Sequence, residues 1–87
     1  MTYQVELTKK ASKQLAKLSE DIQQRIKIKV QELAENPRPS GVVKLENSDN
    51  KYRIRVGNYR VLYEIQDDLL IVSVIRVGHR REVYNNE

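Results

Sequence analysis

The sequence has no cysteine, a single histidine and only three glycines among its 87 residues. Without cysteine the chain can form no disulfide, no thiolate metal site and no cysteine nucleophile. One histidine and no recurring ligand spacing give no basis for a metal centre, and the serines lie in no nucleophile motif. The glycines at 41, 57 and 78 are too far apart to form a phosphate-binding loop. We therefore expect no metal and no cofactor.

Long apolar runs are also absent. No run reaches the roughly 18 apolar residues of a membrane span, and the N-terminal MTYQVELTKK lacks the apolar stretch of a secretory signal. We expect a cytoplasmic protein without membrane contact, folded as a single domain over residues 1–87. Its net charge of +4 favours acidic partners, either nucleic acid or an acidic protein. A soluble basic domain without such a partner would have the same charge.

The N-terminal half predicts one short strand and two helices. Apolar and polar residues alternate over 3–7, which is typical of a half-buried strand. Thr8 can cap a helix over 9–18, and Ser19 can cap a second helix that ends before Asn36-Pro37-Arg38-Pro39. Both helices have an apolar stripe at helical spacing. The stripes consist of Ala11, Leu15 and Leu18, and of Ile22, Ile26, Val30 and Leu33.

The C-terminal half predicts four strands. They are VVKL (42–45), YRIRV (52–56), YRVLYEI (59–65) and LLIVSVIRV (69–77). Gly57-Asn58 is a two-residue hairpin signal, and Asp67-Asp68 indicates a second turn. The last strand is nearly all apolar, so we expect it to be central and buried on both faces. The predicted fold is α+β with the order β-α-α-β-β-β-β: an antiparallel sheet with an N-terminal helical hairpin packed on one face.

The hairpin around Gly57-Asn58 gathers arginines on one face. A two-residue turn pairs Val56 with Tyr59 and Arg55 with Arg60, and directly opposed residues share a face. Arg53, Arg55 and Arg60 then lie on one face and the apolar residues of both strands on the other. Like charges opposite one another destabilise a sheet, so this cluster favours an anion-binding site. The alternative is that the arginines lie over apolar surface with their charged ends in water.

The polar tail adds further groups of the same chemistry. The segment HRREVY (79–84) contains His79, Arg80, Arg81 and Tyr84. Because the strand over 69–77 should pair with 59–65, its end should lie near Tyr59 and Arg60. We therefore expect the tail to bring an imidazole, a phenol and one or two guanidiniums to the rim of the arginine cluster.

Such a set of groups suits metal-free cleavage of an RNA phosphodiester. The 2′-hydroxyl attacks the neighbouring phosphorus, a base takes its proton, an acid protonates the departing 5′-oxygen, and cations stabilise the developing charge. Arginine suits the last role because it stays charged and binds phosphate in a bidentate manner. A histidine titrates near neutrality, and neighbouring positive charge lowers the pKa of a tyrosine. Either His79 or Tyr84 could therefore transfer the protons.

At these residues the chain resembles the RelE/ParE toxin superfamily, in particular the RelE-type mRNA interferases. The resemblance covers nearly the whole chain and is strongest in N-P-R, Y-R-I-R-V-G-N-Y-R-V-L-Y and V-I-R-V-G-H-R-R-E-V-Y. It implies the same β-α-α-β-β-β-β fold and a toxin of a type II toxin–antitoxin pair. Such toxins enter the ribosomal A site and cut mRNA to leave a 2′,3′-cyclic phosphate. A cognate RelB-like antitoxin wraps and neutralises them.

Carried over by position, the resemblance assigns roles to the basic residues. Arg53 and Arg55 match paired basic residues that are often lysine in the family; since arginine does not trade protons, here they should bind RNA. Arg60 matches the arginine of G-x-Y-R. Arg80 and Tyr84 match the basic residue and the tyrosine of the tail. The predicted catalytic residues are thus Arg60, Arg80, Tyr84 and His79, with RNA binding by Arg53, Arg55 and Arg81.

Three other interpretations remain open at this point. A ParE-like toxin would bind DNA gyrase, although a gyrase poison needs no base beside an arginine cluster. A non-catalytic RNA- or ribosome-binding module, or a degenerate toxin, would use the arginines without Tyr84 or His79. A purely structural basic domain has no positive support in the sequence. For a toxin of this charge, an acidic and partly disordered antitoxin segment that folds on binding is the expected inhibitor.

Overall fold

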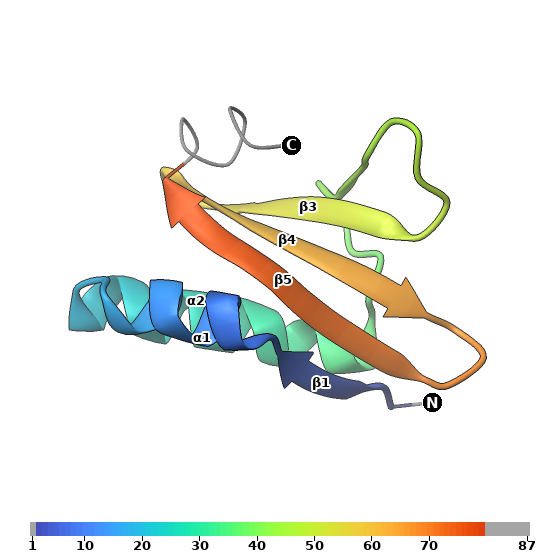
Figure 1. Cartoon of the computed structure of the whole chain (residues 1–87), viewed down its shortest axis with the longest axis horizontal. Coiled ribbons are helices and arrows are strands. Elements are labelled where there is room, and N and C mark those ends of the chain that lie inside the picture. Colours follow the sequence, from blue (N-terminus) through green and yellow to red (C-terminus); the bar gives the residue numbers. More distant parts are fainter. Residues whose placement is uncertain (1, 80–87) are drawn as a thin grey trace.

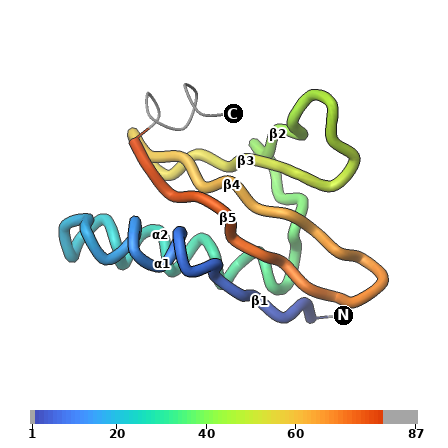
Figure 2. Tube along the Cα trace, in the orientation of Figure 1, coloured from blue at the N-terminus to red at the C-terminus, as the bar shows by residue number. Residues whose placement is uncertain are grey.

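The computed structural model describes residues 2–79, which form two helices and a five-stranded sheet (Figures 1 and 2). The predicted α+β class and element order are confirmed, although the last strand covers 71–79 instead of 69–77 and the first helix is shorter than predicted. The elements are β1 (Gln4–Leu7), α1 (Lys9–Ala16), α2 (Glu20–Glu35), β2 (Val43–Lys44), β3 (Lys51–Val56), β4 (Tyr59–Gln66) and β5 (Ile71–His79). Neither helix is long and apolar enough to cross a membrane.

The sheet has the strand order β1-β5-β4-β3-β2, and it is mixed. Strands β2 to β5 form the predicted antiparallel meander, but β1 pairs with β5 in parallel, with Gln4 opposite Ile71. The antiparallel description therefore needs correction at this edge. Alternation of apolar and polar residues predicts a strand, but it contains no information on the direction in which that strand joins the sheet.

Both helices lie on one side of the sheet (Figure 1). Their predicted stripes supply one side of the core: Ala11 and Leu15 from α1, and Ile26, Val30 and Leu33 from α2, are buried. The strands supply the other side, with Tyr52, Ile54, Val61, Tyr63, Ile65, Val72, Val74 and Val77. Thr8 caps α1 as predicted, because its Oγ1 accepts a hydrogen bond from the Ala11 amide at 3.1 Å.

The β3–β4 hairpin has the predicted register. Val56 opposes Tyr59 and Arg55 opposes Arg60, so the apolar residues of both strands face the helices. Gly57 has a φ of 60°, whereas Asn58 is not among the residues with positive φ. This is the pattern of a type II′ turn, which places glycine at its first central position. The hairpin therefore fixes which residues face away from the helices.

A β-bulge in β5 changes the face of its residues part-way along the strand. Leu62 pairs with Arg76 but Tyr63 pairs with Val74, so Ile75 has no partner on β4. The extra residue keeps Val74 in the core and turns Arg76 to the face away from the helices. Strand β5 is interior to the sheet, but β4 is central. The expectation that β5 is buried on both faces was wrong, because Ser73, Ile75 and Arg76 are only half-buried.

A polar network joins the N-terminus, the loop after α2 and the β4–β5 turn. The Arg38 guanidinium donates two hydrogen bonds to the Asp67 carboxylate, at 3.2 and 2.8 Å, and Tyr3 donates to the same carboxylate at 2.6 Å. Arg38 Nε also donates to the Tyr52 hydroxyl at 3.2 Å. These bonds, first those from Arg38 and then that from Tyr3, lower the pKa of Asp67 to about 2. The predicted turn at Asp67-Asp68 is thus also an anchor.

Candidate functional site

Three arginines of the β3–β4 hairpin lie on the sheet face that points away from the helices. Arg55 directly opposes Arg60, and Arg53 opposes Leu62 two pairs further from the turn. The clustering predicted from the Gly57-Asn58 turn is therefore present. The clustering follows from the alternation of side chains between the two faces of a strand. Ile54 and Val61, the neighbours of these arginines in the sequence, are buried in the core on the other face. The arrangement concentrates positive charge where the sheet is not covered by the helices.

The three side chains differ in exposure. Arg60 is buried, with only 3% of its surface exposed, whereas Arg53 is half-buried and Arg55 is exposed. Arg60 Nη1 donates to the Tyr59 carbonyl at 3.4 Å, and the residue opposite Arg60 on β5 is Gly78, which has no side chain. A guanidinium is not deprotonated in proteins. Arg60 therefore places a permanent charge at a fixed position in the sheet, which is what electrostatic stabilisation of a reacting phosphate requires.

A hollow of about 290 Å³ lies beside these arginines. Arg53, Arg55 and Arg60 line it, together with Lys29 from α2 and the loop at Ser40-Gly41. The hollow exists because β2 is only two residues long and pairs only with Tyr52 and Arg53. The rest of the outer edge of β3 is therefore not covered by a strand. An anion in this hollow would meet several guanidiniums at once, the arrangement that binds phosphate most tightly.

His79 is on the other side of the sheet from the arginine cluster. As expected, the end of β5 lies beside Tyr59 and Arg60, but the register pairs His79 with Tyr59 and Gly78 with Arg60. Directly opposed residues share a face, so the imidazole is on the helix-side face of Tyr59. The two rings meet edge to face, with their centroids 5.7 Å apart. The structure thus separates His79 from the guanidiniums that the sequence-based hypothesis grouped with it.

The sequence did not point to Arg76 as part of this face. It lies within an apolar run, and only the bulge at Ile75 brings it beside Leu62, across from Arg53. Extrapolating the pairing from the β4–β5 turn without a bulge would place Arg76 opposite Val61, in the core. A lone arginine in a strand that otherwise reads as buried was the available signal, since a buried unpaired charge is strongly disfavoured.

The remaining predicted site residues, Arg80, Arg81 and Tyr84, lie outside the described residues. Their assignment rests on the sequence alone.

Comparison with known proteins identifies the family. Residues 5–84 match the model of the ParE toxin of the type II toxin–antitoxin system parDE. The chain belongs to the RelE/ParE toxin superfamily. This membership agrees with the fold and confirms the resemblance seen in the hairpin and tail motifs. The protein that contains the arginine cluster is therefore a toxin of a toxin–antitoxin system.

Individual relatives within this superfamily have RelE names. A putative RelE-like toxin protein from Escherichia coli is 34% identical over 88 residues, covering 98% of this toxin and 93% of the relative. The mRNA interferase toxin RelE of E. coli K12 is 33% identical over 89 residues, with the same coverage of 98% and 93%. The toxin also superposes on a chain of the archaeal RelE–RelB complex from Pyrococcus horikoshii OT3. The TM-score is 0.82 at 29% identity, over 92% of this chain and 97% of the other.

Proposed function

We propose that this toxin is an endoribonuclease that cuts mRNA at the ribosomal A site without a metal ion. The observation that carries the proposal is the buried guanidinium of Arg60 among Arg53 and Arg55, on the sheet face free of helices. A fixed cation with two neighbours matches the charge that develops on a phosphoryl group during cleavage. The E. coli relative named an mRNA interferase supports the same activity.

In the proposed reaction the 2′-hydroxyl of the RNA is the nucleophile. Its oxygen forms a bond to the adjacent phosphorus while the bond from phosphorus to the 5′-oxygen of the next nucleotide breaks. A base takes the proton of the 2′-hydroxyl and an acid protonates the departing 5′-oxygen, so the products are a 2′,3′-cyclic phosphate and a free 5′-hydroxyl. Arg60 stabilises the charge on the non-bridging oxygens, and Arg53 and Arg55 hold the RNA backbone. We assign Arg80 to the scissile phosphate, and Arg81 to binding of RNA or the ribosome.

The position of His79 affects which residue can transfer protons in this reaction. A base must lie within hydrogen-bond reach of the proton that it takes. His79 packs against Tyr59 on the helix-side face, whereas the substrate would meet Arg60 on the other face. This separation favours Tyr84, the other candidate, as the base. His79 would then position Tyr59 and the end of β5.

We further propose a RelB-like antitoxin as the inhibitory partner. Structural relatives of this toxin include a RelE–RelB complex. A net charge of +4 and the arginine cluster would be neutralised by an acidic segment that folds on the toxin. An Arg60→Ala variant, which the proposed mechanism predicts to be non-toxic, should co-purify with such a protein when it is tagged and expressed within its operon. Recovery of the tagged chain alone at native expression levels would contradict this partner.

The function is tested by inducing the wild type, Arg60→Ala and Tyr84→Phe in growing cells and mapping cut sites on a translated mRNA by primer extension. We expect cuts within the reading frame that disappear when translation is blocked. In a reconstituted translation assay, Arg60→Ala should lower kcat about 100- to 1,000-fold, as loss of a preorganised charge-stabilising donor does. Arg60→Lys keeps the charge but not the bidentate geometry, so its kcat should lie between that of the wild type and that of Arg60→Ala.

The matched control is Arg25→Ala, which removes the same charge from an exposed position on α2. It should cut like the wild type, and thermal unfolding of each variant would exclude loss of fold as the cause. Wild-type cutting that survives Arg60→Ala would refute the mechanism. The match to the ParE family model favours gyrase inhibition as the second candidate. Growth arrest with intact message, and relief of that arrest by added gyrase, would support it instead.

A further inference from the structure

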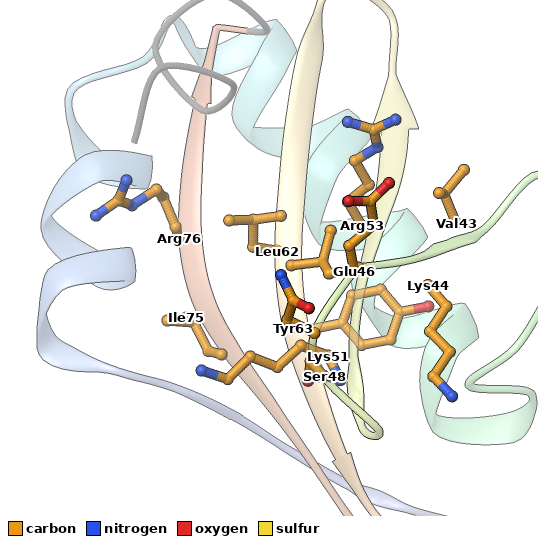
Figure 3. Close-up of a pocket in the computed structure, with 12 residues that line it drawn as sticks. Val43, Lys44, Glu46, Ser48, Lys51, Arg53, Leu62, Tyr63, Ile75 and Arg76 are labelled. Carbon is orange, nitrogen blue, oxygen red and sulfur yellow. Dashed lines mark hydrogen bonds between the residues drawn. The ribbon is translucent and has the colours of Figure 1, made fainter. Parts of the chain in front are cut away.

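Arg53, which belongs to the arginine cluster, and Arg76 lie on either side of Leu62 on the sheet face away from the helices (Figure 3). Arg53 on β3 and Arg76 on β5 each oppose Leu62 on β4. Neighbouring strands are 4.7–4.9 Å apart, so the Cα atoms of this pair are roughly 10 Å apart. The row is two residues, or about 7 Å, along the strands from the row that contains Arg55 and Arg60.

The pair lies in a groove of about 690 Å³, within the size range of small-ligand sites. Its floor includes the apolar side chains of Leu62 and Ile75, and the loop that follows β2 forms one wall. The bulge makes this floor, since it leaves Ile75 unpaired on β4 and adjacent to Arg76. The groove therefore has an apolar base with a guanidinium from a different strand on each side.

The charge of the groove favours an anionic ligand. Among residues 2–79, four cationic side chains line it, Lys44, Lys51, Arg53 and Arg76, and one carboxylate, that of Glu46, so these residues contribute a net charge of +3. Cations beside an apolar floor suit single-stranded nucleic acid, because the phosphates meet the charges while the base covers the apolar surface. An acidic peptide would satisfy the cations but would leave the apolar floor without a flat partner.

The groove is continuous with the arginine cluster. Arg53 and Val43 line both this groove and the smaller hollow that contains Arg55 and Arg60. An RNA strand with one phosphate at Arg60 would therefore pass Arg53 and enter the groove with an adjacent nucleotide.

We propose that this groove is a subsite for the nucleotide next to the scissile phosphate, and that Arg76 positions the RNA by binding its backbone. The proposal rests on the proposed function for the place of the scissile phosphate. Arg76 takes no part in the proton transfers, so it acts on substrate binding and not on the chemical step.

The first test measures binding without cleavage. A short 2′-O-methyl RNA, which lacks the nucleophilic hydroxyl, is titrated by fluorescence anisotropy at several salt concentrations. Loss of one phosphate contact should reduce the slope of log K against log salt by about 0.7 for a single strand. We expect this reduction and a several-fold weaker affinity for Arg76→Ala, restoration of the slope by Arg76→Lys, and no change for Arg25→Ala. Equal slopes for the wild type and Arg76→Ala, or no binding by the wild type, would overturn the subsite.

The second test separates binding from chemistry. On translated message Arg76→Ala should raise KM about tenfold with kcat within about twofold of the wild type, which is the signature of lost uniform binding at 1.4 kcal/mol per tenfold. A fall in kcat with unchanged KM would overturn the positioning role. If the wild type cuts no RNA but its salt slope still depends on Arg76, the nuclease proposal fails and the groove remains an RNA site. Thermal unfolding of Arg76→Ala checks that the fold is intact.

Discussion

Asp67 is the residue whose charge holds distant parts of the chain together. Its carboxylate accepts hydrogen bonds from Arg38, after α2, and from Tyr3, at the start of the chain. Arg38 also lies over the ring of Tyr52, 5.3 Å from its centroid, so the network extends into the core. Exposed ion pairs usually contribute little, but the bidentate geometry and the shared partner make this one a defined anchor.

The pH dependence of stability tests this anchor. The pKa of Asp67 is lowered from 3.8 to about 2 in the folded chain, so the unfolded chain takes up the proton at higher pH. The contribution of Asp67 to the free energy of unfolding is therefore complete above its ordinary pKa and is lost as the pH falls toward 2. Urea midpoints of the wild type and Asp67→Asn should differ at neutral pH and converge in acid.

The control for this measurement is Asp68→Asn, which removes the adjacent exposed carboxylate of the same turn. Its midpoints should follow those of the wild type across the range. A wild type and Asp67→Asn that stay equally separated down to the lowest pH would show that the lost stability does not come from the ionised carboxylate.

At the scale of elements, α1 and its capping residue provide hydrogen-bond partners for backbone groups of β5 beyond the end of β1. The parallel pairing stops at Leu7, and Thr8 then donates its amide to the Val74 carbonyl at 2.9 Å and its hydroxyl to the Ile75 carbonyl at 3.2 Å. Further along, Gln14 Oε1 accepts a hydrogen bond from the Val77 amide at 2.8 Å. Thr8, which caps α1, and the side chain of Gln14 thus satisfy backbone groups that the bulge and the end of β1 would leave unpaired.

Substitution of Gln14 tests this function of the helix. Gln14→Ala should lower the free energy of unfolding by about 1–2 kcal/mol, because it leaves the part-buried Val77 amide without its acceptor. Gln14→Glu keeps an acceptor oxygen and should retain most of the stability. Hydrogen exchange of the Val77 amide should accelerate in Gln14→Ala only. Ser12→Ala, at an exposed position of the same helix, is the control. Unchanged Val77 exchange in Gln14→Ala would contradict the assignment.

At the scale of the whole molecule, the strand pairs differ greatly in the length of chain that they close. The meander from β2 to β5 is made of neighbours in sequence, but β1 must meet β5 across almost the entire chain (Figure 2). Loop closure costs more entropy as the loop grows. We therefore expect the meander to form before β1 joins it, with folding in the millisecond-to-second range of mixed folds that have long-range pairings.

Folding kinetics test this order. Val5→Ala in β1 should mainly accelerate unfolding, with a φ-value below about 0.3, whereas Val61→Ala in the hairpin should mainly slow refolding, with a φ-value above about 0.5. Both valines pack in or against the core, so each truncation should be large enough to measure. Stopped-flow chevron plots provide the rates. A φ-value at Val5 as high as that at Val61 would mean that the β1–β5 pairing belongs to the folding nucleus.

The sequence alone was sufficient for the features that local periodicity encodes. Helical spacing of Ala11 and Leu15 predicted a buried stripe, and the two-residue turn at Gly57-Asn58 predicted the hairpin register that gathers the arginines. The motifs around them were specific enough to indicate the RelE/ParE superfamily, which the family match confirms. These features depend on residues within a few positions of one another, so the chain carries them without reference to the rest of the fold.

Tertiary structure decided what depends on contacts between distant segments. It made β1 parallel to β5, placed the bulge that turns Arg76 outward, and put His79 on the face opposite Arg60. It also joined Asp67 to Arg38. None of these follows from local alternation, because each arises from the fit of one element against another in the core. A single extra residue at Ile75 reverses the face of every residue on one side of it, and only packing determines where that residue falls.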